Sequence, residues 1–216
     1  MKHPSPGADR ARALALVPVS PEAEARLAIY VDLLARWRTV TNLISAASFA
    51  EVWTRHIADS AQLLPLAPDA KRCVDLGSGA GFPGMVIAIQ LADAPGARVH
   101  CLESDQRKCA FLREVARATG APAQIHPVRI ESIDPITLAP VDAVTARAFA
   151  PLPRLLEFAK VWLAQGAVGV FPRGRSAEAQ LETNPAAQDL AIDLVASKLD
   201  PEAAILRVRS ASKARS

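Results

Sequence analysis

The chain is poor in cysteine: its 216 residues include only Cys73, Cys101 and Cys109. Structural zinc requires CxxC pairs or clustered histidines, and these three cysteines have neither. The same scarcity argues against a disulfide framework, and we interpret the three residues as core cysteines of a reducing compartment. We therefore expect a cytoplasmic protein that holds no metal.

Long apolar runs are also missing. No segment reaches the roughly 18 consecutive apolar residues of a membrane-spanning helix. Residues 13–19 follow Arg10 and Arg12 and faintly resemble a signal peptide, but the run is short, contains Pro18 and leads into acidic residues. We predict no membrane segment and no cleaved signal.

The excess of positive charge is small and is concentrated at one end. The formal net charge is +3, and the segment from Arg207 to Ser216 carries four cations and no acids. The rest of the chain is therefore close to neutral. A basic tail at residues 211–216 can contact phosphate groups or simply keep the protein in solution, and the sequence leaves both interpretations open.

The first 70 residues differ in pattern from the remainder. Residues 1–19 are rich in Pro, Ala and Arg and are expected to be a poorly ordered leader. A helix is predicted to begin with Ser20 as its cap and Pro21 at its first position. A second helix is predicted to open with a capping box at residues 48–51. We expect these helices to form a lid, residues 20–70, on the main domain.

From residue 71 to residue 210 the pattern is that of an α/β domain. Apolar runs predict strands near residues 72–76, 97–103, 123–129, 141–147 and 167–172, and helices fit at about 83–92, 105–119 and 151–164. Alternating strands and helices predict a mostly parallel sheet with helices on both faces. Residues 191–198 and 204–209 have no helix between them and are expected to form a terminal antiparallel pair.

The strongest motif is a glycine-rich turn that joins the first predicted strand to a helix. It spans residues 74–84, where glycines allow a sharp bend and a close approach to a ligand. Glu103 ends the next strand, and a carboxylate there can accept both hydroxyls of a ribose. Because ligands bind at the carboxyl ends of strands in such sheets, the two features predict a cofactor that contains adenosine.

Two cofactor classes compete for this turn. Residues 79–84 satisfy G-x-G-x-x-G, so a nicotinamide or flavin dinucleotide is a legitimate rival. Three details favour S-adenosylmethionine (SAM). Asp75 lies two residues before the first glycine, where it can sense the positive amino-acid end of the ligand. The loop continues through Phe82 and Pro83, and the terminal strand pair is typical of methyltransferase topology.

The ordered motifs resemble those of the bacterial small-subunit ribosomal RNA guanine-N7 methyltransferases (RsmG, also called GidB). The resemblance runs from about Ile29 to Arg209 and is carried by Trp37 with residues 41–44, residues 55–60, residues 75–84, Lys108 with residues 111–114, and residues 147–150 with Leu152. It implies a class I SAM-dependent fold with a seven-stranded sheet and an N-terminal helical extension. It further implies methylation of N7 of one guanine in the decoding-region loop of 16S ribosomal RNA. We expect a cytoplasmic monomer that acts on this RNA or on the small ribosomal subunit.

The resemblance also assigns roles to residues. It implies that the methionine end of SAM lies on the loop of Asp75, Gly77, Ser78, Gly79, Gly81 and Phe82, and that Glu103 holds the ribose, with Ser104 also contacting the cofactor. Arg129, Ile130 and Glu131 are expected beside the adenine, and Arg147 is expected at the active site as the catalytic residue and a further contact to the cofactor. Relatives often carry Lys-Gly where this chain has residues 172–175. Arg173 and Arg175 keep the positive charge there and are candidate RNA contacts, although arginine and lysine differ as phosphate binders.

The chemistry of N7 agrees with the residues at the end of the fourth strand. Guanine N7 has a lone pair and no proton to lose, so positioning alone can support methyl transfer. Amino-group methyltransferases place an Asn/Asp-Pro-Pro-aromatic tetrad where this chain has residues 145–149, and carbon-5 pyrimidine enzymes need a cysteine there. Both are disfavoured. Phe149 is a candidate for stacking on a base, or a core residue.

Other interpretations stay open at this stage. His56 and Asp59 form an i,i+3 pair on a predicted helix, which favours a hydrogen bond that orients the lid over a role in catalysis. Arg147 can equally form a structural ion pair with Asp75 or Asp142. The chain can also be a SAM enzyme that acts on a small molecule or protein, or a dinucleotide-binding module without chemistry.

Overall fold

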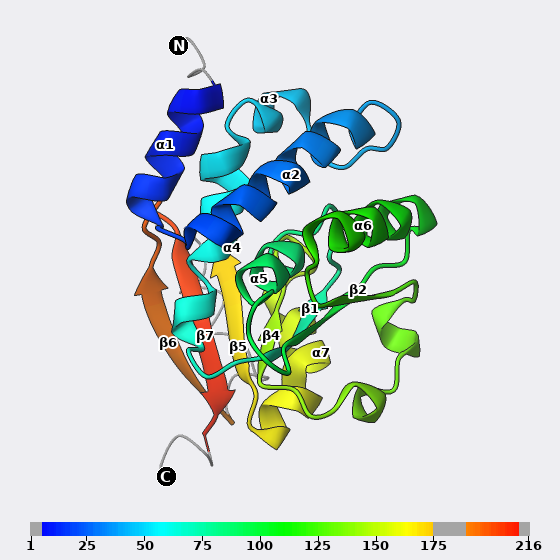
Figure 1. Ribbon diagram of the computed structural model, residues 1–216. Helices are drawn as coiled ribbons and strands as arrows, with labels where there is room; N and C mark the ends of the chain where they lie inside the picture. Colours follow the sequence, from blue (N-terminus) through cyan, green and yellow to red (C-terminus); the bar gives the residue numbers. More distant parts are fainter. Residues whose placement is uncertain (1–5, 175–188, 212–216) are drawn as a thin grey trace.

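One seven-stranded sheet organises the molecule (Figure 1). The computed structural model describes residues 6–174 and 189–211. The strands lie in the order β3-β2-β1-β4-β5-β7-β6. Their bounds are β1 Arg72–Leu76, β2 Arg98–Leu102, β3 Ala123–His126, β4 Ala143–Thr145, β5 Val168–Arg173, β6 Leu190–Ala196 and β7 Ala204–Ser210.

The sheet is parallel except at its last two strands. β1 pairs in parallel with both β2 and β4, while β7 runs antiparallel between β5 and β6. The strand order therefore reverses between β1 and β4, and a crevice forms at the carboxyl ends of strands on either side of such a point. The prediction of a mostly parallel sheet with a terminal antiparallel pair is confirmed.

Helices cover both faces of this sheet and bury two separate cores. Helices α5 (Gly84–Gln90) and α6 (Gln106–Thr119) pack with the N-terminal helices on one face, and α7 (Leu152–Gln165) packs on the other. Short turns of 3-10 helix complete the described fold: η2 Leu64–Leu66, η3 Ile130–Ser132 and η4 Pro135–Leu138. Neighbouring residues of one strand point to opposite cores, as Cys73 and Val74 do on β1.

The N-terminal leader is not disordered over most of its length, so the expectation for residues 1–19 is wrong from residue 6 onward. Pro6–Leu16 form helix α1, and Ala13 and Val17 are buried in the core. Asp9 is 1% exposed; its Oδ2 accepts a hydrogen bond from the backbone N–H of Trp53 at 2.9 Å, and its Oδ1 accepts one from Thr54 Oγ1 at 2.6 Å. These contacts fasten α1 to the lid and give the helix its tertiary support.

The lid itself follows the prediction at its start and departs from it later. Helix α2 (Pro21–Trp37) begins as expected, with the Ser20 hydroxyl accepting from the backbone N–H of Ala23. The predicted capping box at residues 48–51 is wrong, because helix α3 (Ala46–Phe49) already begins after Ser45, whose hydroxyl caps Ser48 N–H. The chain then continues through the π-helix η1 (Trp53–Ala58) and α4 (Asp59–Ala61).

No helix of the described residues is both long enough and apolar enough to cross a membrane.

The buried carboxylate of Asp9 generates a prediction for stability. Asp9→Ala leaves the first N–H groups of η1 and the Thr54 hydroxyl without their acceptor, so the free energy of unfolding should fall by about 2 kcal/mol. Urea titration followed by circular dichroism measures the change. Asp32→Ala, at an exposed position of α2, is the matched control. Equal stability of the two variants would contradict the anchoring role.

Two histidines predict how stability changes with pH. His100 Nδ1 and His126 Nε2, on neighbouring strands, lie 2.9 Å apart. When both rings are neutral, one of these two nitrogens donates a proton to the other. Burial, then repulsion by His126 and Arg98, lowers the pKa of His100 to about 4, and burial also lowers the pKa of His126. In the unfolded chain both imidazoles regain the ordinary histidine pKa of about 6.5, so each takes up a proton near that pH.

The free energy of unfolding should therefore fall as the pH drops from about 6.5 toward 4, because the unfolded state binds more protons in that window. His100→Gln removes one of these groups and should make the pH dependence shallower. Urea titrations of both proteins at several pH values test this. A variant curve as steep as that of the wild type between pH 6.5 and pH 5 would argue against the pair.

Candidate functional site

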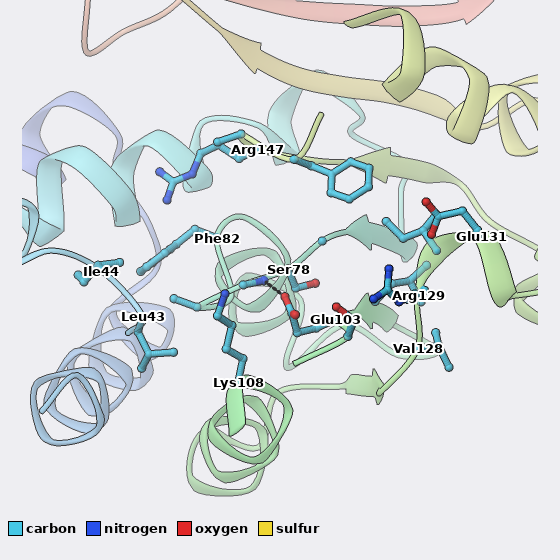
Figure 2. A pocket seen from close by; sticks show the side chains of 18 residues that line it. Leu43, Ile44, Ser78, Phe82, Glu103, Lys108, Val128, Arg129, Glu131 and Arg147 are labelled. Atoms are coloured by element: carbon cyan, nitrogen blue, oxygen red, sulfur yellow. Dashed lines mark hydrogen bonds between the residues drawn. The ribbon is translucent and has the colours of Figure 1, made fainter. Parts of the chain in front are cut away.

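A cavity of about 470 Å³ opens at the carboxyl ends of β1, β2 and β4, where the strand order reverses. Figure 2 shows Phe82 and Arg147 at one end of it, Arg129 and Glu131 at the other, and Glu103 between them. The lining residues are Leu43, Ile44, Gly77, Ser78, Gly79, Ala80, Phe82, Leu102, Glu103, Ser104, Lys108, Val128, Arg129, Ile130, Glu131, Arg147, Ala148 and Phe149.

The floor of this cavity is the glycine turn after β1. Gly77 and Gly79 have φ values of +68° and +57°, a region that favours glycine. A Cβ on Gly77 would lie 2.4 Å from Cδ2 of Phe149, whereas one on Gly79 would meet nothing closer than the Gly77 carbonyl oxygen at 3.8 Å. Glycine at these positions therefore keeps the backbone accessible from the cavity.

Glu103 connects the turn to the neighbouring strand. It follows β2, is 8% exposed, and lines the cavity together with Ser104. Its Oε2 accepts a hydrogen bond from the backbone N–H of Gly79 at 2.8 Å (Figure 2). Its Oε1 accepts one from the backbone N–H of Asp105, also at 2.8 Å. These two bonds fix the orientation of the carboxylate and still leave acceptor capacity for hydroxyl donors.

Two residues predicted to touch the cofactor lie elsewhere. Asp75 is 0% exposed and does not line the cavity; its Oδ1 accepts from Thr145 Oγ1 at 2.8 Å, and its side chain lies against Gly84 at the start of α5. Burial raises the pKa of Asp75. Gly81 is also absent from the lining, and a Cβ there would lie 2.8 Å from Tyr30 Oη. Both residues shape the turn from behind.

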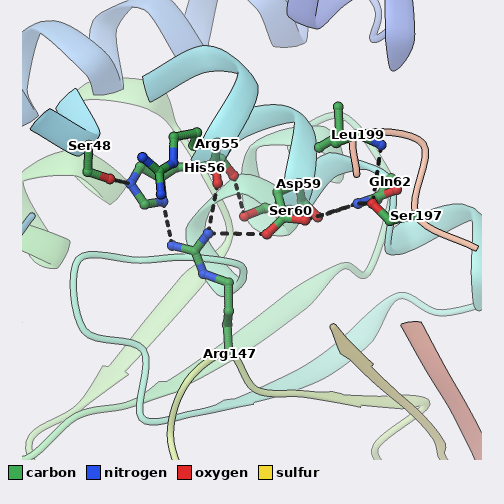
Figure 3. A network of polar contacts seen from close by, with 9 residues as sticks. All are labelled: Ser48, Arg55, His56, Asp59, Ser60, Gln62, Arg147, Ser197 and Leu199. Atoms are coloured by element: carbon green, nitrogen blue, oxygen red, sulfur yellow. Dashed lines mark hydrogen bonds and ion pairs between the residues drawn. The ribbon is translucent and has the colours of Figure 1, made fainter. Parts of the chain in front are cut away.

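Arg147 extends from the end of β4 to the lid rather than to another strand (Figure 3). Its Nη2 lies 2.7 Å from Nδ1 of His56, and its Nη1 donates to the carbonyl of Arg55 at 3.2 Å and to Oδ2 of Asp59 at 3.3 Å. The guanidinium carbon also lies 5.1 Å from the ring centre of Phe82. The alternative ion pairs considered for Arg147, with Asp75 or Asp142, are not formed.

His56 and Asp59 meet at Arg147 and not with each other. The imidazole of His56 contacts the Ser48 hydroxyl through Nε2 and stacks on Phe82 with ring centres 4.8 Å apart. Burial, then the charges of Arg147 and Arg55, lowers the pKa of His56 to about 3. Asp59 accepts from Gln62 through Oδ1, and burial raises its pKa. The predicted hydrogen bond between His56 and Asp59 is therefore not formed, and each residue contacts Arg147 instead.

A second cavity of about 430 Å³ lies on the other side of Arg147. It is formed by η1 and α4, by the ends of β4 and β5, and by the turn between β6 and β7, and it is lined by Thr54, Arg55, Asp59, Arg147, Ala148, Pro172, Arg173, Gly174, Ser197, Leu199, Asp200, Ala203, Ala204 and Ile205. Arg147 and Ala148 line both cavities. Arg173 lies here as predicted, whereas Arg175 lies outside the described residues.

The residue between Arg147 and Phe149 is strained. Ala148 has a φ of +50°, a region that costs roughly 1–2 kcal/mol for a residue with a Cβ. Phe149 turns into the first cavity, against Gly77, and its ring centre lies 5.8 Å from that of Phe158. The structure therefore separates Phe149 from the second cavity, where Arg173 lies.

Sequence reasoning missed part of the cavity wall. Leu43 and Ile44 come from the loop before α3, and Lys108 comes from α6. All three lie in segments on which the family resemblance rests. The sequence therefore indicated that these residues matter, but it gave no reason to place them in the wall of the cavity. Among the described residues, no group of three or more His, Cys, Asp or Glu side chains is placed to hold a metal.

The residues of the first cavity fit SAM. The glycine turn is open to the cavity, and the Glu103 carboxylate beside it is fixed by the hydrogen bond of 2.8 Å from Gly79 N–H to its Oε2. The volume of the cavity falls in the range of about 300–1,000 Å³ that small-molecule sites occupy. The lining carries both acids, Glu103 and Glu131, and bases, Lys108, Arg129 and Arg147. This mixture suits a ligand with an ammonium group, a carboxylate and ribose hydroxyls. Aliphatic side chains at Leu102, Val128 and Ile130 suit a flat purine.

A family model described as rRNA small subunit methyltransferase G matches residues 23–198. The chain belongs to this family. A ribosomal RNA small subunit methyltransferase G from Nitrobacter hamburgensis is 53% identical over 178 residues, covering 82% of this chain and 68% of its own. One from Methylorubrum extorquens is 47% identical over 204 residues, covering 94% and 96%. The resemblance inferred from the motifs is confirmed.

Solved structures show the same fold. TrmN from Thermus thermophilus superposes with a TM-score of 0.54 at 20% identity, covering 70% of this chain and 48% of that one. A rRNA methylase from Streptococcus thermophilus gives 0.50 at 14% identity, covering 67% and 91%. At this level of identity the likeness concerns the fold alone, and it confirms the class I SAM-dependent methyltransferase fold rather than a dinucleotide-binding module.

Glu103 generates a prediction for cofactor binding. Glu103→Gln keeps the size of the side chain but loses the charge that strengthens hydrogen bonds from ribose hydroxyls, so the Kd for S-adenosylhomocysteine should rise about 10- to 100-fold. Isothermal titration calorimetry measures this. Glu157→Gln, at an exposed site on α7, is the control. Unchanged affinity of Glu103→Gln would show that the carboxylate holds only the turn.

Proposed function

We propose that this protein transfers a methyl group from SAM to N7 of a guanine in 16S ribosomal RNA. The observation that carries the proposal is that two cavities meet at Arg147 and Ala148: one fits the cofactor, and the other is open to a base. Family membership supports the choice of ribosomal RNA as the substrate, since the relatives are named ribosomal RNA small subunit methyltransferase G.

In this proposal the first cavity holds the cofactor by residues of three strand ends. The backbone of Gly77, Ser78 and Gly79 borders the methionine end, with Phe82 beyond it, and Glu103 with Ser104 accepts the ribose hydroxyls. Arg129, Ile130 and Glu131 line the adenine end. When bound, SAM supplies a methyl group on a sulfonium, which is a strong electrophile.

The second cavity would receive the guanine. Arg147 lies on the wall between the two cavities, so its N–H groups can donate to O6 of a guanine whose N7 points toward the first cavity. Asp59 and Asp200 also line this cavity, and carboxylates there can accept from the N1–H and N2–H groups of guanine. Arg55 and Arg173 at its margin suit the flanking phosphates.

The residues at the junction suit a reaction that needs no base. N7 has no proton to lose, so the protein contributes position and a suitable field. The imidazole of His56, which contacts Arg147, has a lowered pKa and is already engaged by Arg147 and Ser48. Burial raises the pKa of all three cysteines, to about 12 for Cys73, which opposes a thiolate mechanism.

The same proposal extends to the setting of the protein. Ribosomal RNA is found in the cytoplasm, and we infer that the protein acts there as a monomer, without a metal, on RNA or on the assembled small subunit. The basic tail at residues 211–216, of which only Ala211 is described, is a further candidate for contact with RNA.

The function is tested by nucleoside analysis of 16S ribosomal RNA. Deletion of the gene should remove one 7-methylguanosine, and purified protein with SAM should restore it in small subunits from the deletion strain. Arg147→Ala removes the donor on the shared wall, so the rate of restoration should fall about 10- to 100-fold.

Arg117→Ala, at an exposed position of α6, is the matched control and should restore the nucleoside at the wild-type rate. Methyl transfer to a different nucleoside would reject the N7 assignment while keeping the SAM enzyme. An Arg147→Ala protein as fast as the control would reject the role of Arg147 at the junction.

A further inference from the structure

The position of Arg147 depends on an imidazole that touches neither cavity. Nδ1 of His56 lies 2.7 Å from Nη2 of Arg147, and His56 is absent from the lining of both cavities, whereas Arg147 lines both. Figure 3 shows the guanidinium turned toward the lid, with His56 on one side and Asp59 on the other. A residue that touches no substrate thus contacts the residue at the junction.

The protonation state of this imidazole follows from its partners. A guanidinium is a donor only, so the Nδ1 atom that faces Arg147 must carry a lone pair. The proton of a neutral ring is then on Nε2, where the Ser48 hydroxyl oxygen accepts it. Arg147 therefore selects the tautomer, and the Ser48 hydroxyl, which can donate or accept, adapts to it by accepting the Nε2 proton.

The ring is also fixed in its plane. It stacks on Phe82 with ring centres 4.8 Å apart and an angle of 19° between the planes, and the guanidinium of Arg147 lies over the same phenyl ring. Charged groups near it are Arg55 on η1, Arg147 from β4, and Asp59 on α4. Burial of the ring, and then the charges of Arg147 and Arg55, favour its neutral form, which agrees with its lowered pKa.

We propose that His56 is a positioning residue for methyl transfer: its neutral imidazole, stacked on Phe82 and bonded through Nε2–H to Ser48, keeps the guanidinium of Arg147 on the wall shared by the two cavities. The inference rests on the proposed function and adds to it the group that orients Arg147. Asp59 neutralises part of the charge, while His56 supplies direction without charge. A carboxylate in its place would draw Arg147 into a tighter ion pair and away from a base.

Two substitutions separate the parts of this role. His56→Asn keeps an acceptor oxygen near the position of Nδ1 but loses the stacked ring, whereas His56→Phe keeps a stacked ring on Phe82 but has no acceptor. Loss of a hydrogen bond to a charged group corresponds to about a 10- to 100-fold change, so kcat of His56→Phe should fall by that factor. His56→Asn should stay within about fivefold of the wild type by the same reasoning.

The assay measures kcat, the KM for small subunits and the Kd for S-adenosylhomocysteine for each purified variant. The Kd should change little in both, because His56 lines neither cavity. Ser48→Ala, which removes the hydroxyl that accepts the Nε2 proton and so loosens the ring, is the second test and should lower kcat with the protein folded. In the wild type, ¹⁵N shifts should report a proton on Nε2 and none on Nδ1 at neutral pH.

The outcomes distinguish this inference from the proposed function. If the wild type forms no 7-methylguanosine, the proposed function fails before any variant is compared, although the tautomer can still be read from the ¹⁵N shifts. If the wild type is active and His56→Phe matches it, or if His56→Asn and His56→Phe lose activity equally, the positioning role is overturned. A proton on Nδ1 in the wild type would also overturn it.

Discussion

The contact between Arg147 and the lid is the constraint on which the rest of the site depends. A guanidinium has five N–H donors in one plane and no acceptor, so it can be held only by oxygen atoms and unprotonated nitrogens in matching directions. The lid supplies three such partners, the Arg55 carbonyl, His56 Nδ1 and Asp59 Oδ2. Each comes from η1 or α4, which pack on α1 and α5 respectively, so the N-terminal extension supplies these partners to the α/β domain.

The supporting layers of the site follow from this contact. Asp9 caps the start of η1, the segment that carries Arg55 and His56, while Gln62 joins Asp59 to the strand pair through Ser197 and the backbone of Lys198. Two regions far apart in the sequence therefore hold one short helical segment. π-Helical segments occur often at functional sites, since they move a few side chains and carbonyl groups out of the regular α-helical register. Here the carbonyl of Arg55 is one of the groups that Arg147 uses.

The sheet and the cofactor turn could be predicted from the sequence because their signals are local. The strand at residues 72–76 is a short apolar run ending in glycines, and the structure places β1 at the same residues. Other features depended on distant partners. Asp9 gave no sign that it was buried, because its partners Trp53 and Thr54 lie more than 40 residues away, and an arginine-rich leader with prolines resembles a disordered one. Asp75 was misplaced for a related reason: an acid before a glycine turn can face a ligand or support the turn from behind, and only the position of Thr145 and Gly84 decides which.

The charges of the two cavities are matched: each is lined by two acids and three bases, and Arg147 is common to both. Methyl transfer to N7 moves one positive charge from the first cavity to the second. Arg147 borders both cavities, so its positive charge repels the methyl-bearing cation to a similar degree before and after transfer. An interaction that is equal in the ground state and the transition state does not accelerate a reaction. Its contribution must then come from orientation, which is why the direction of its N–H groups matters more than its charge. The other charges do not separate the two sides: Glu103 and Glu131 lie with Lys108 and Arg129 in the first cavity, and Asp59 and Asp200 lie with Arg55 and Arg173 in the second. With the charges matched on the two sides, the direction of the Arg147 N–H groups remains its contribution.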